Sequence, residues 1–132
     1  MFSPLEIATN YVDIGTKKGK MSATKTLLLG IFAGMFIAFG GIASTAASAT
    51  LEGSMAKVVS GLVFPAGLAM VLMAGSELFT GDNLVIIALL EKKIRFRDLM
   101  KNWVCVFFGN FIGAILVTLL VVYGHTPDMF GG

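Results

Sequence analysis

The longest apolar run in the sequence, residues 58–90, is too long to cross a membrane as one straight helix. At a rise of about 1.5 Å per residue it would extend about 50 Å, whereas the hydrocarbon core of a bilayer is about 30 Å thick. Two further apolar runs, residues 27–49 and 103–123, are close to the roughly 20 residues that one crossing requires. Since 56% of the residues are hydrophobic and the mean hydropathy is +0.86, we predict an all-α membrane protein with three spans, the second of them broken.

Basic residues gather at alternate ends of these runs and predict the orientation of the chain. They precede the first run and fill the loop 91–101 between the second and third runs (Lys17, Lys18, Lys20 and Lys25; Lys92, Lys93, Arg95, Arg97 and Lys101). The first connection has only Lys57 beside Glu52. Because cytoplasmic loops carry an excess of Lys and Arg, the N-terminus and loop 91–101 are predicted to be cytoplasmic in a multi-pass protein of the cell membrane. No groove-binding basic element is present in the sequence, so a nucleic-acid partner is not expected.

Residues 1–25 are predicted to form a cytoplasmic amphipathic helix and a linker. Ser3 is suited to cap a helix, Pro4 suits the first helical position, and Glu6 can close a capping box onto the Ser3 amide. Apolar residues then recur at helical spacing. The stretch 15–20, Gly-Thr-Lys-Lys-Gly-Lys, is predicted to be the linker and not a phosphate-binding loop, because it lacks the Gly-Lys-Ser/Thr ending.

Glycines recur at a spacing of four in two of the apolar runs. Gly30 and Gly34 lie in the first run, and Gly109 and Gly113 lie in the third. Small residues at this spacing allow the backbones of membrane helices to approach closely. We therefore predict tight helix packing at both pairs.

The break in the second run is predicted at residues 75–83, Gly-Ser-Glu-Leu-Phe-Thr-Gly-Asp-Asn, where glycines, acids and capping residues interrupt the apolar sequence. Irregular backbone at membrane depth is tolerated only where it is buried in protein or lines a water-filled cavity. Gly81, Asp82 and Asn83 are placed to start a short half-helix whose unpaired amides attract anions. The segment is therefore predicted to build an ion site, as discontinuous helices do in many transport proteins.

Residues 72–81, Leu-Met-Ala-Gly-Ser-Glu-Leu-Phe-Thr-Gly, resemble the Gly-small-acid-Leu-Phe-Thr-Gly/Ser element of the formate/nitrite transporter family. Flanking residues fit the second and third helices of that family without a gap (Phe64, Gly67 and Leu68; Lys101, Asn102 and Trp103; Phe108, Gly109 and Asn110). The resemblance covers nearly the whole chain but only the first half of a family member.

The resemblance implies that residues 26–132 are a transmembrane half-channel. Family channels have six spans in two inverted three-span repeats and assemble as aquaporin-like homopentamers with a pore in each protomer; an odd number of spans inverts a following copy. The second repeat, in the same gene product or in a separate chain, would therefore be a partner. The central histidine and the pore lysine of the family belong to that second half. His125, the only histidine here, is expected in a solvent-exposed loop.

Positions within the matched segments imply pore roles for five residues. Leu68 and Leu78 correspond to residues that narrow the family's pore on its cytoplasmic side, and Phe64 and Phe79 correspond to its outer constriction. Thr80 resembles the loop threonine that hydrogen-bonds toward the central histidine, and it is the residue expected to touch the ion. Without the motif, the same side chains would be interpreted as helix packing and Thr80 as a helix cap.

Four residues are predicted to anchor the loop: Gly75, Glu77, Gly81 and Asn83. A buried carboxylate repels anions and is costly when unpaired, so Glu77 is expected to accept hydrogen bonds from loop amides. Asp82 stands where many family members have a small or amide residue, which makes the local potential of this chain different.

The resemblance implies a selective channel or transporter for a small monovalent anion: formate, nitrite or hydrosulfide. Rings of Leu and Phe would select by size, while helix-end amides and Thr80 replace water around the anion. The alternative, a non-transporting three-span assembly subunit, explains the small-residue packing but not the polar loop. An enzyme is not expected, because the sequence has no nucleophile paired with a base and no nucleotide loop. The lone Cys105 is interpreted as a packing residue, and no metal or cofactor is predicted.

Overall fold

The computed structural model describes residues 1–125 and 128, and every regular element in this part of the chain is helical. The elements are α1 (Pro4–Gly19), α2 (Ala23–Ser48), α3 (Gly53–Val63), α4 (Pro65–Ala74), α5 (Phe79–Asp82), the 3-10 turn η1 (Asn83–Val85), α6 (Ile86–Leu90) and α7 (Phe96–Tyr123). Three stretches are long and apolar enough to cross a membrane: Ala23–Ser48, Gly53–Ala74 and Phe96–Tyr123. The predicted all-α protein with three spans, the second of them broken, is confirmed.

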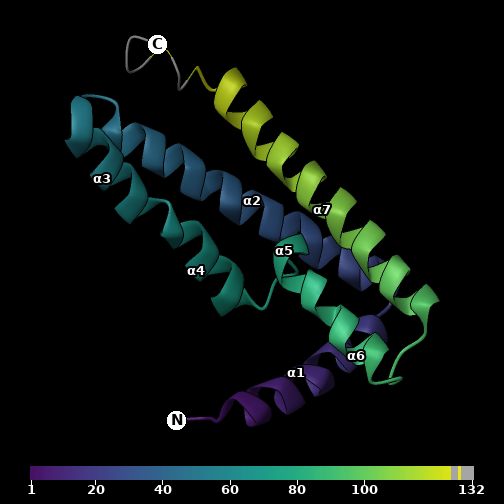
Figure 1. Ribbon diagram of the computed structural model, residues 1–132. Helices are drawn as coiled ribbons and strands as arrows, with labels where there is room; N and C mark the ends of the chain where they lie inside the picture. The colour runs from purple at the N-terminus through teal and green to yellow at the C-terminus, as the bar shows by residue number, and fades with distance from the viewer. Residues whose placement is uncertain (126–127, 129–132) are drawn as a thin grey trace.

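Helices α2 and α7 run side by side in the same direction, and α3 and α4 return along α2 in the opposite direction (Figure 1). The close approach predicted for both glycine pairs is confirmed at the contact between α2 and α7. A Cβ at Gly30 would lie 3.3 Å from the Cα of Gly109, and a Cβ at Gly34 would clash with the backbone of Asn110. Backbone meets backbone here, so the two helices need glycine at these positions.

The second span has an interruption at Phe64 that the sequence analysis did not predict. Helix α3 ends at Val63 and α4 begins at Pro65, whose ring nitrogen has no hydrogen to donate. At the start of α4, the Gly67 amide donates a hydrogen bond to the Phe64 carbonyl, three residues earlier, at 3.0 Å. The span also begins at Gly53, earlier than the apolar run 58–90 suggested.

Helix α1 corrects the prediction of a linker at residues 15–20, because the helix continues to Gly19. Gly15 and Gly19 are buried, and a Cβ added at Gly15 would lie 3.1 Å from the Ala88 Cβ. A Cβ at Gly19 would lie 3.0 Å from a methyl group of Ile94. These glycines therefore let the end of α1 pack closely against α6 and the segment that follows it.

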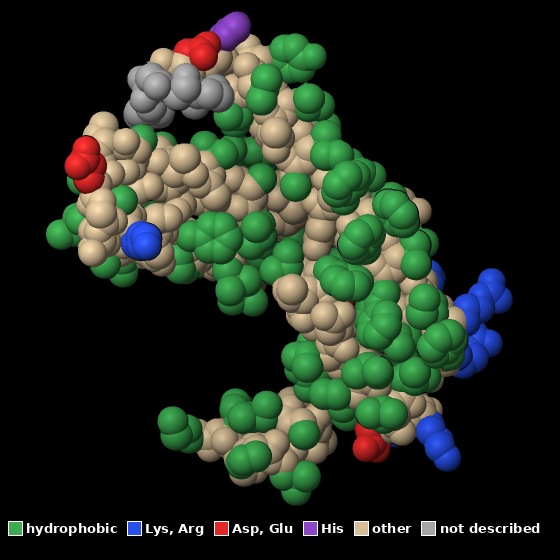
Figure 2. Space-filling model, turned by 45° about the horizontal axis from the view of Figure 1, so that its top comes forward, with side chains coloured by type: hydrophobic (Ala, Val, Ile, Leu, Met, Phe, Trp, Pro, Cys, Tyr) green, Lys and Arg blue, Asp and Glu red, His purple; other side chains and the backbone are tan. Residues whose placement is uncertain are grey.

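The start of α1 has the predicted capping box. The Ser3 hydroxyl accepts from the Glu6 amide at 3.3 Å, and the Glu6 carboxylate accepts from the Ser3 amide at 2.7 Å. Residues 1–10 are all exposed, and this half of α1 projects from the body beside a hollow in the molecular surface (Figure 2). Helix α1 lies across the base of the bundle (Figure 1).

The predicted basic loop 91–101 is also shorter in the structure, because α7 begins at Phe96. The Arg95 amide donates to the Asp98 carboxylate at 3.1 Å, which caps the start of the helix. His125 follows α7 with a φ of 53° and an exposed side chain, as expected, and its Nδ1 lies 3.2 Å from Asp128 Oδ2. The Thr-Pro pair after it, residues 126–127, lies outside the described residues.

Candidate functional site

The break in the second span begins with a glycine turn at the end of α4. Gly75 has φ 62° and ψ 33°, a left-handed conformation that glycine adopts without steric penalty. The Gly75 amide donates to the Leu72 carbonyl at 3.3 Å, and the Ser76 amide donates to the Val71 carbonyl at 3.0 Å. These two bonds form a Schellman motif, which closes the helix and turns the chain away from its axis.

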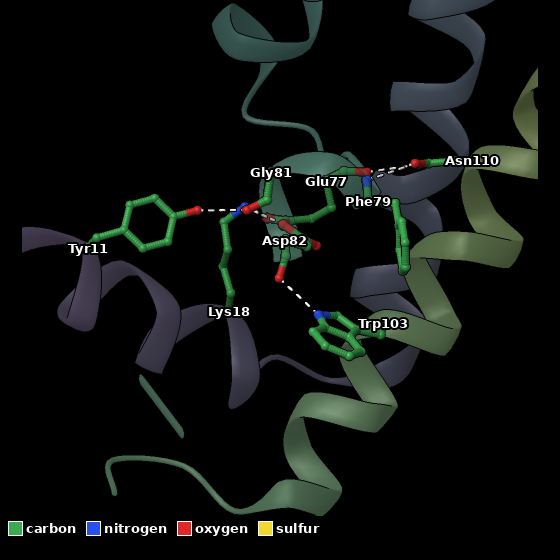
Figure 3. A network of polar contacts seen from close by, with 8 residues as sticks. All are labelled: Tyr11, Lys18, Glu77, Phe79, Gly81, Asp82, Trp103 and Asn110. Atoms are coloured by element: carbon green, nitrogen blue, oxygen red, sulfur yellow. Dashed lines mark hydrogen bonds and ion pairs between the residues drawn. The ribbon is translucent and has the colours of Figure 1, made fainter. Parts of the chain in front are cut away.

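The chain is irregular from Gly75 to Leu78, and Asn110 of α7 stabilises it (Figure 3). The Asn110 amide nitrogen donates to the carbonyls of Gly30 and Glu77 at 2.8 and 2.9 Å. Its oxygen accepts from the Phe79 amide at 2.9 Å. The Glu77 amide donates to the Leu29 carbonyl of α2 at 3.3 Å. The backbone groups of Glu77 and the Phe79 amide are thus paired with α2 and α7, which satisfies them in a low-dielectric environment.

A buried ion cluster joins α1 to the same segment. Lys18 Nζ lies 2.7 Å from Glu77 Oε2 and 2.7 Å from Asp82 Oδ1. The side chains are 21%, 6% and 0% exposed, respectively. Burial by itself lowers the pKa of Lys18, but its hydrogen bonds to Asp82 and Glu77 raise the pKa above its ordinary 10.5 on balance, so the ammonium is charged at neutral pH.

The cluster changes the interpretation of Glu77. Its carboxylate was expected to accept from loop amides, but the structure pairs it with Lys18. The physical reason is that residues 15–19 are helical and packed, so that α1 directs Lys18 at the loop. One ammonium serves two carboxylates, and Asp82 Oδ2 is buried with no hydrogen-bond partner among the described residues.

The short helix α5, only four residues long, is held by side chains from both neighbouring helices. The Tyr11 hydroxyl of α1 donates to the Gly81 carbonyl at 2.8 Å. The Trp103 ring nitrogen of α7 donates to the Asp82 carbonyl at 3.0 Å. A helix this short is not stable by itself, so these external bonds fix its direction. It begins at Phe79, earlier than the predicted start at residues 81–83.

The residues predicted to line a pore differ in how far the rest of the chain covers them. Phe64 and Leu68, one helical turn apart, are 46% and 43% exposed on the α3–α4 span. Thr80 is exposed on α5, and Leu78 is half-buried. The structure therefore leaves three of them uncovered by the rest of this chain.

Phe79 lies differently, because its ring packs on α7. It meets the Trp103 ring edge-on with the centroids 6.4 Å apart, and the Phe107 ring in the same manner at 5.6 Å. The Phe79 side chain thus contributes to holding α5 against α7.

Two of the predicted anchors, Gly81 and Asn83, do not hold the loop through side-chain contacts. An added Cβ at Gly81 would meet no atom within 4 Å, although the Gly81 carbonyl accepts the Tyr11 bond. Asn83 is exposed at the start of η1, and its side chain forms no hydrogen bond to any other described residue. The side chains that do hold the loop, and that the sequence analysis did not assign to it, are Lys18, Tyr11, Trp103 and Asn110. A polar Asn110 inside an apolar run was the one available signal.

Within residues 1–125 and 128, no group of three or more His, Cys, Asp or Glu side chains could hold a metal ion. The groups that this arrangement offers are suited to binding. They are the Thr80 hydroxyl, the irregular backbone segment and the buried ion cluster of Lys18, Glu77 and Asp82.

The chain is similar in sequence to known proteins. A sequence model of the family described as "Formate/nitrite transporter" matches residues 5–131. The formate channel BtFdhC of Bacillus thuringiensis is 36% identical over 133 residues, which cover 98% of this chain and 51% of that protein. The formate channel FocA of Escherichia coli (strain K12) is 36% identical over 121 residues, covering 89% and 42%. A probable formate transporter of Methanothermobacter thermautotrophicus is also 36% identical, covering 87% and 44%. The chain thus spans about half the length of the curated relatives it matches, in agreement with half of a six-span channel.

Proposed function

Because the chain belongs to the formate/nitrite transporter family, we propose that it is one half of a membrane channel for small monovalent anions, with formate as the first candidate. The relatives are named as channels and transporters, in agreement with the prediction that this protein is not an enzyme. The observation that carries the proposal is the irregular segment between α4 and α5, clamped by Asn110 beside an exposed Thr80. A non-transporting assembly subunit would have no use for such a segment within a span.

The proposed path runs along the exposed side of α4 and past α5. Phe64 and Leu68 would form constrictions that exclude larger solutes, and Leu78 would narrow the path beside the loop. The Thr80 hydroxyl would replace water around the anion between them. Since the Phe79 amide already donates to Asn110, the contact with the anion is assigned to the Thr80 hydroxyl and not to the first amide of α5.

The pore needs partners for completion. We propose that a second, inverted three-span repeat closes it, in the same gene product or in a separate chain, and that the protomers assemble as a homopentamer. The basic residues at the base of the bundle favour a cytoplasmic N-terminus in the cell membrane. Nitrite and hydrosulfide are the other candidate substrates, because they share the size and charge of formate.

The test is anion flux into proteoliposomes that contain the full-length protein. We expect formate, nitrite or hydrosulfide to pass faster than chloride, and equal rates for all four would refute the proposed selectivity. Thr80→Val should lower flux about tenfold, the value of roughly one hydrogen bond. The control is Thr118→Val, because the Thr118 hydroxyl is bonded only within α7. Equal flux through both variants would remove Thr80 from the path.

A further inference from the structure

We propose that Glu77 and Asp82 hold one proton between them, which makes their cluster with Lys18 a proton-binding site that sets the charge beside Thr80. The existence of the proton site depends only on the geometry of this chain. Its effect on anion passage depends in addition on the proposed function.

The first argument is the unequal number of charges. A single Lys18 Nζ lies 2.7 Å from one oxygen of each carboxylate, so the two acids share one cation. Two carboxylates that share a site do not both ionise readily, because their charges repel each other. A buried charge without a partner is strongly unfavourable. One bound proton would make the cluster neutral.

The second argument is the buried oxygen without a partner. Asp82 is 0% exposed, and its Oδ2 has no hydrogen-bond partner among the described residues. The chain itself already covers this side chain, so a second repeat, a neighbouring subunit or a hydrated ion could reach it only after a rearrangement. A proton needs no such opening.

The third argument is the absence of another cation among the described groups that face the cluster. Helix α1 contributes Lys18 and the neutral hydroxyl of Tyr11. Helix α2 contributes the Leu29 carbonyl, which accepts from the Glu77 amide. Helix α7 contributes the Trp103 ring nitrogen, while the ammonium of the neighbouring Lys101 is bonded to the Met21 carbonyl at 2.7 Å.

The consequence follows from the charge. With the proton bound, one ammonium balances one carboxylate, and an anion near Thr80 meets no excess negative charge. Release of the proton at higher pH leaves the cluster at a net charge of −1, which repels an anion from the adjacent path. Anion flux is therefore expected to fall as pH rises, and Asp82→Asn, which has the shape of the protonated acid without its titration, should remove that dependence.

The proton itself can be detected without any flux. Infrared difference spectra of the full-length protein in lipid report the C=O band of a protonated carboxylic acid. We expect such a band at neutral pH, lost on alkaline titration and lost in both Asp82→Asn and Glu77→Gln. Glu52→Gln removes an exposed acid outside the cluster and should keep the band. A wild-type spectrum with no such band, or a band that persists in both cluster variants, would overturn the proposal.

Flux measured over the same pH range tests the effect on the path. The wild type should lose flux as pH rises, whereas Asp82→Asn should have a flat profile and conduct better than the wild type at high pH. If the wild type conducts and Asp82→Asn keeps the wild-type profile, the cluster does not control the path. If the wild type conducts no anion at all, the proposed function fails. The infrared band still shows whether Glu77 and Asp82 hold a proton.

Discussion

Asn110 shows how much one side chain contributes to this site. It pairs with three backbone groups, on Gly30, Glu77 and Phe79. Glu77 lies in the irregular segment, and Phe79 directly follows it. We expect Asn110→Leu to lower the free energy of unfolding by about 3 kcal/mol, since each buried unpaired group costs roughly 1–3 kcal/mol. Denaturant unfolding in detergent micelles measures this loss. Thr118→Val on the same helix should leave stability almost unchanged, and an equal effect of both variants would contradict the role of Asn110.

Gly75 is the other residue on which the break depends. Its φ of 62° is strained for any residue with a Cβ, although an added Cβ would meet no atom within 4 Å. Gly75→Ala is therefore expected to destabilise the protein by about 1–2 kcal/mol through backbone strain alone. Gly81→Ala is the matched control, because it too has open space but no positive φ. Equal melting temperatures for the two variants would show that the left-handed turn is not maintained.

Between helices, Lys18 is the link that joins α1 to the broken span. Its removal leaves two buried acidic side chains without a cation, and breaking a buried ion pair typically costs about 3–5 kcal/mol. We expect Lys18→Met to speed hydrogen exchange of the α1 amides at least about a hundredfold. Lys20→Met, which removes an exposed charge near the same helix end, should not change the exchange. Unchanged protection of α1 in Lys18→Met would show that the ion cluster does not hold the helix.

The pH dependence of this link has a definite sign. The folded state raises the pKa of Lys18 above 10.5, so the stabilisation carried by its charge is fully present below that pH. It is lost as the pH rises through the higher pKa of the folded state. In the wild type, the protection of α1 against hydrogen exchange should therefore be lost only in strongly alkaline solution. In Lys18→Met the protection should already be lost at neutral pH.

The close contact between α2 and α4 sets the position of α4 and of the exposed side chains on it. A Cβ at Gly67 would lie 2.9 Å from the Phe36 carbonyl oxygen and 3.2 Å from the Gly40 Cα, both backbone atoms. Gly67→Ala should push α4 away from α2, displace the neighbouring Phe64 and Leu68, and cost about 1–3 kcal/mol. The expected result is a changed ratio of formate to nitrite flux, with Gly61→Ala, which meets no atom within 4 Å, unchanged. The same ratio in both variants would mean that this contact does not position the path.

The chain as a whole presents apolar side chains over its helices and charges at the ends, and basic residues gather at one end (Figure 2). Small residues fill the contact between α2 and α7, so most large apolar side chains remain for lipid or for a second repeat. This distribution predicts opposite exposure of the two connections. In a Cys105→Ala background, Lys93→Cys should react with an impermeant maleimide only from the cytoplasm and Ser54→Cys only from outside. Labelling of both from the same side would refute the predicted orientation.

The sequence by itself determined the three spans, the position of the break and the glycine turn that begins it. These features depend on contiguous residues: hydropathy over about 20 positions, and the freedom of Gly75 to adopt a positive φ. Only the tertiary structure decided which groups hold the break. Lys18 pairs with Glu77 across 59 positions, and Tyr11 bonds to Gly81 across 70. Among several lysines of similar local sequence, Lys18 was selected because Gly15 and Gly19 pack α1 against the segment after the break, and no local pattern records that contact.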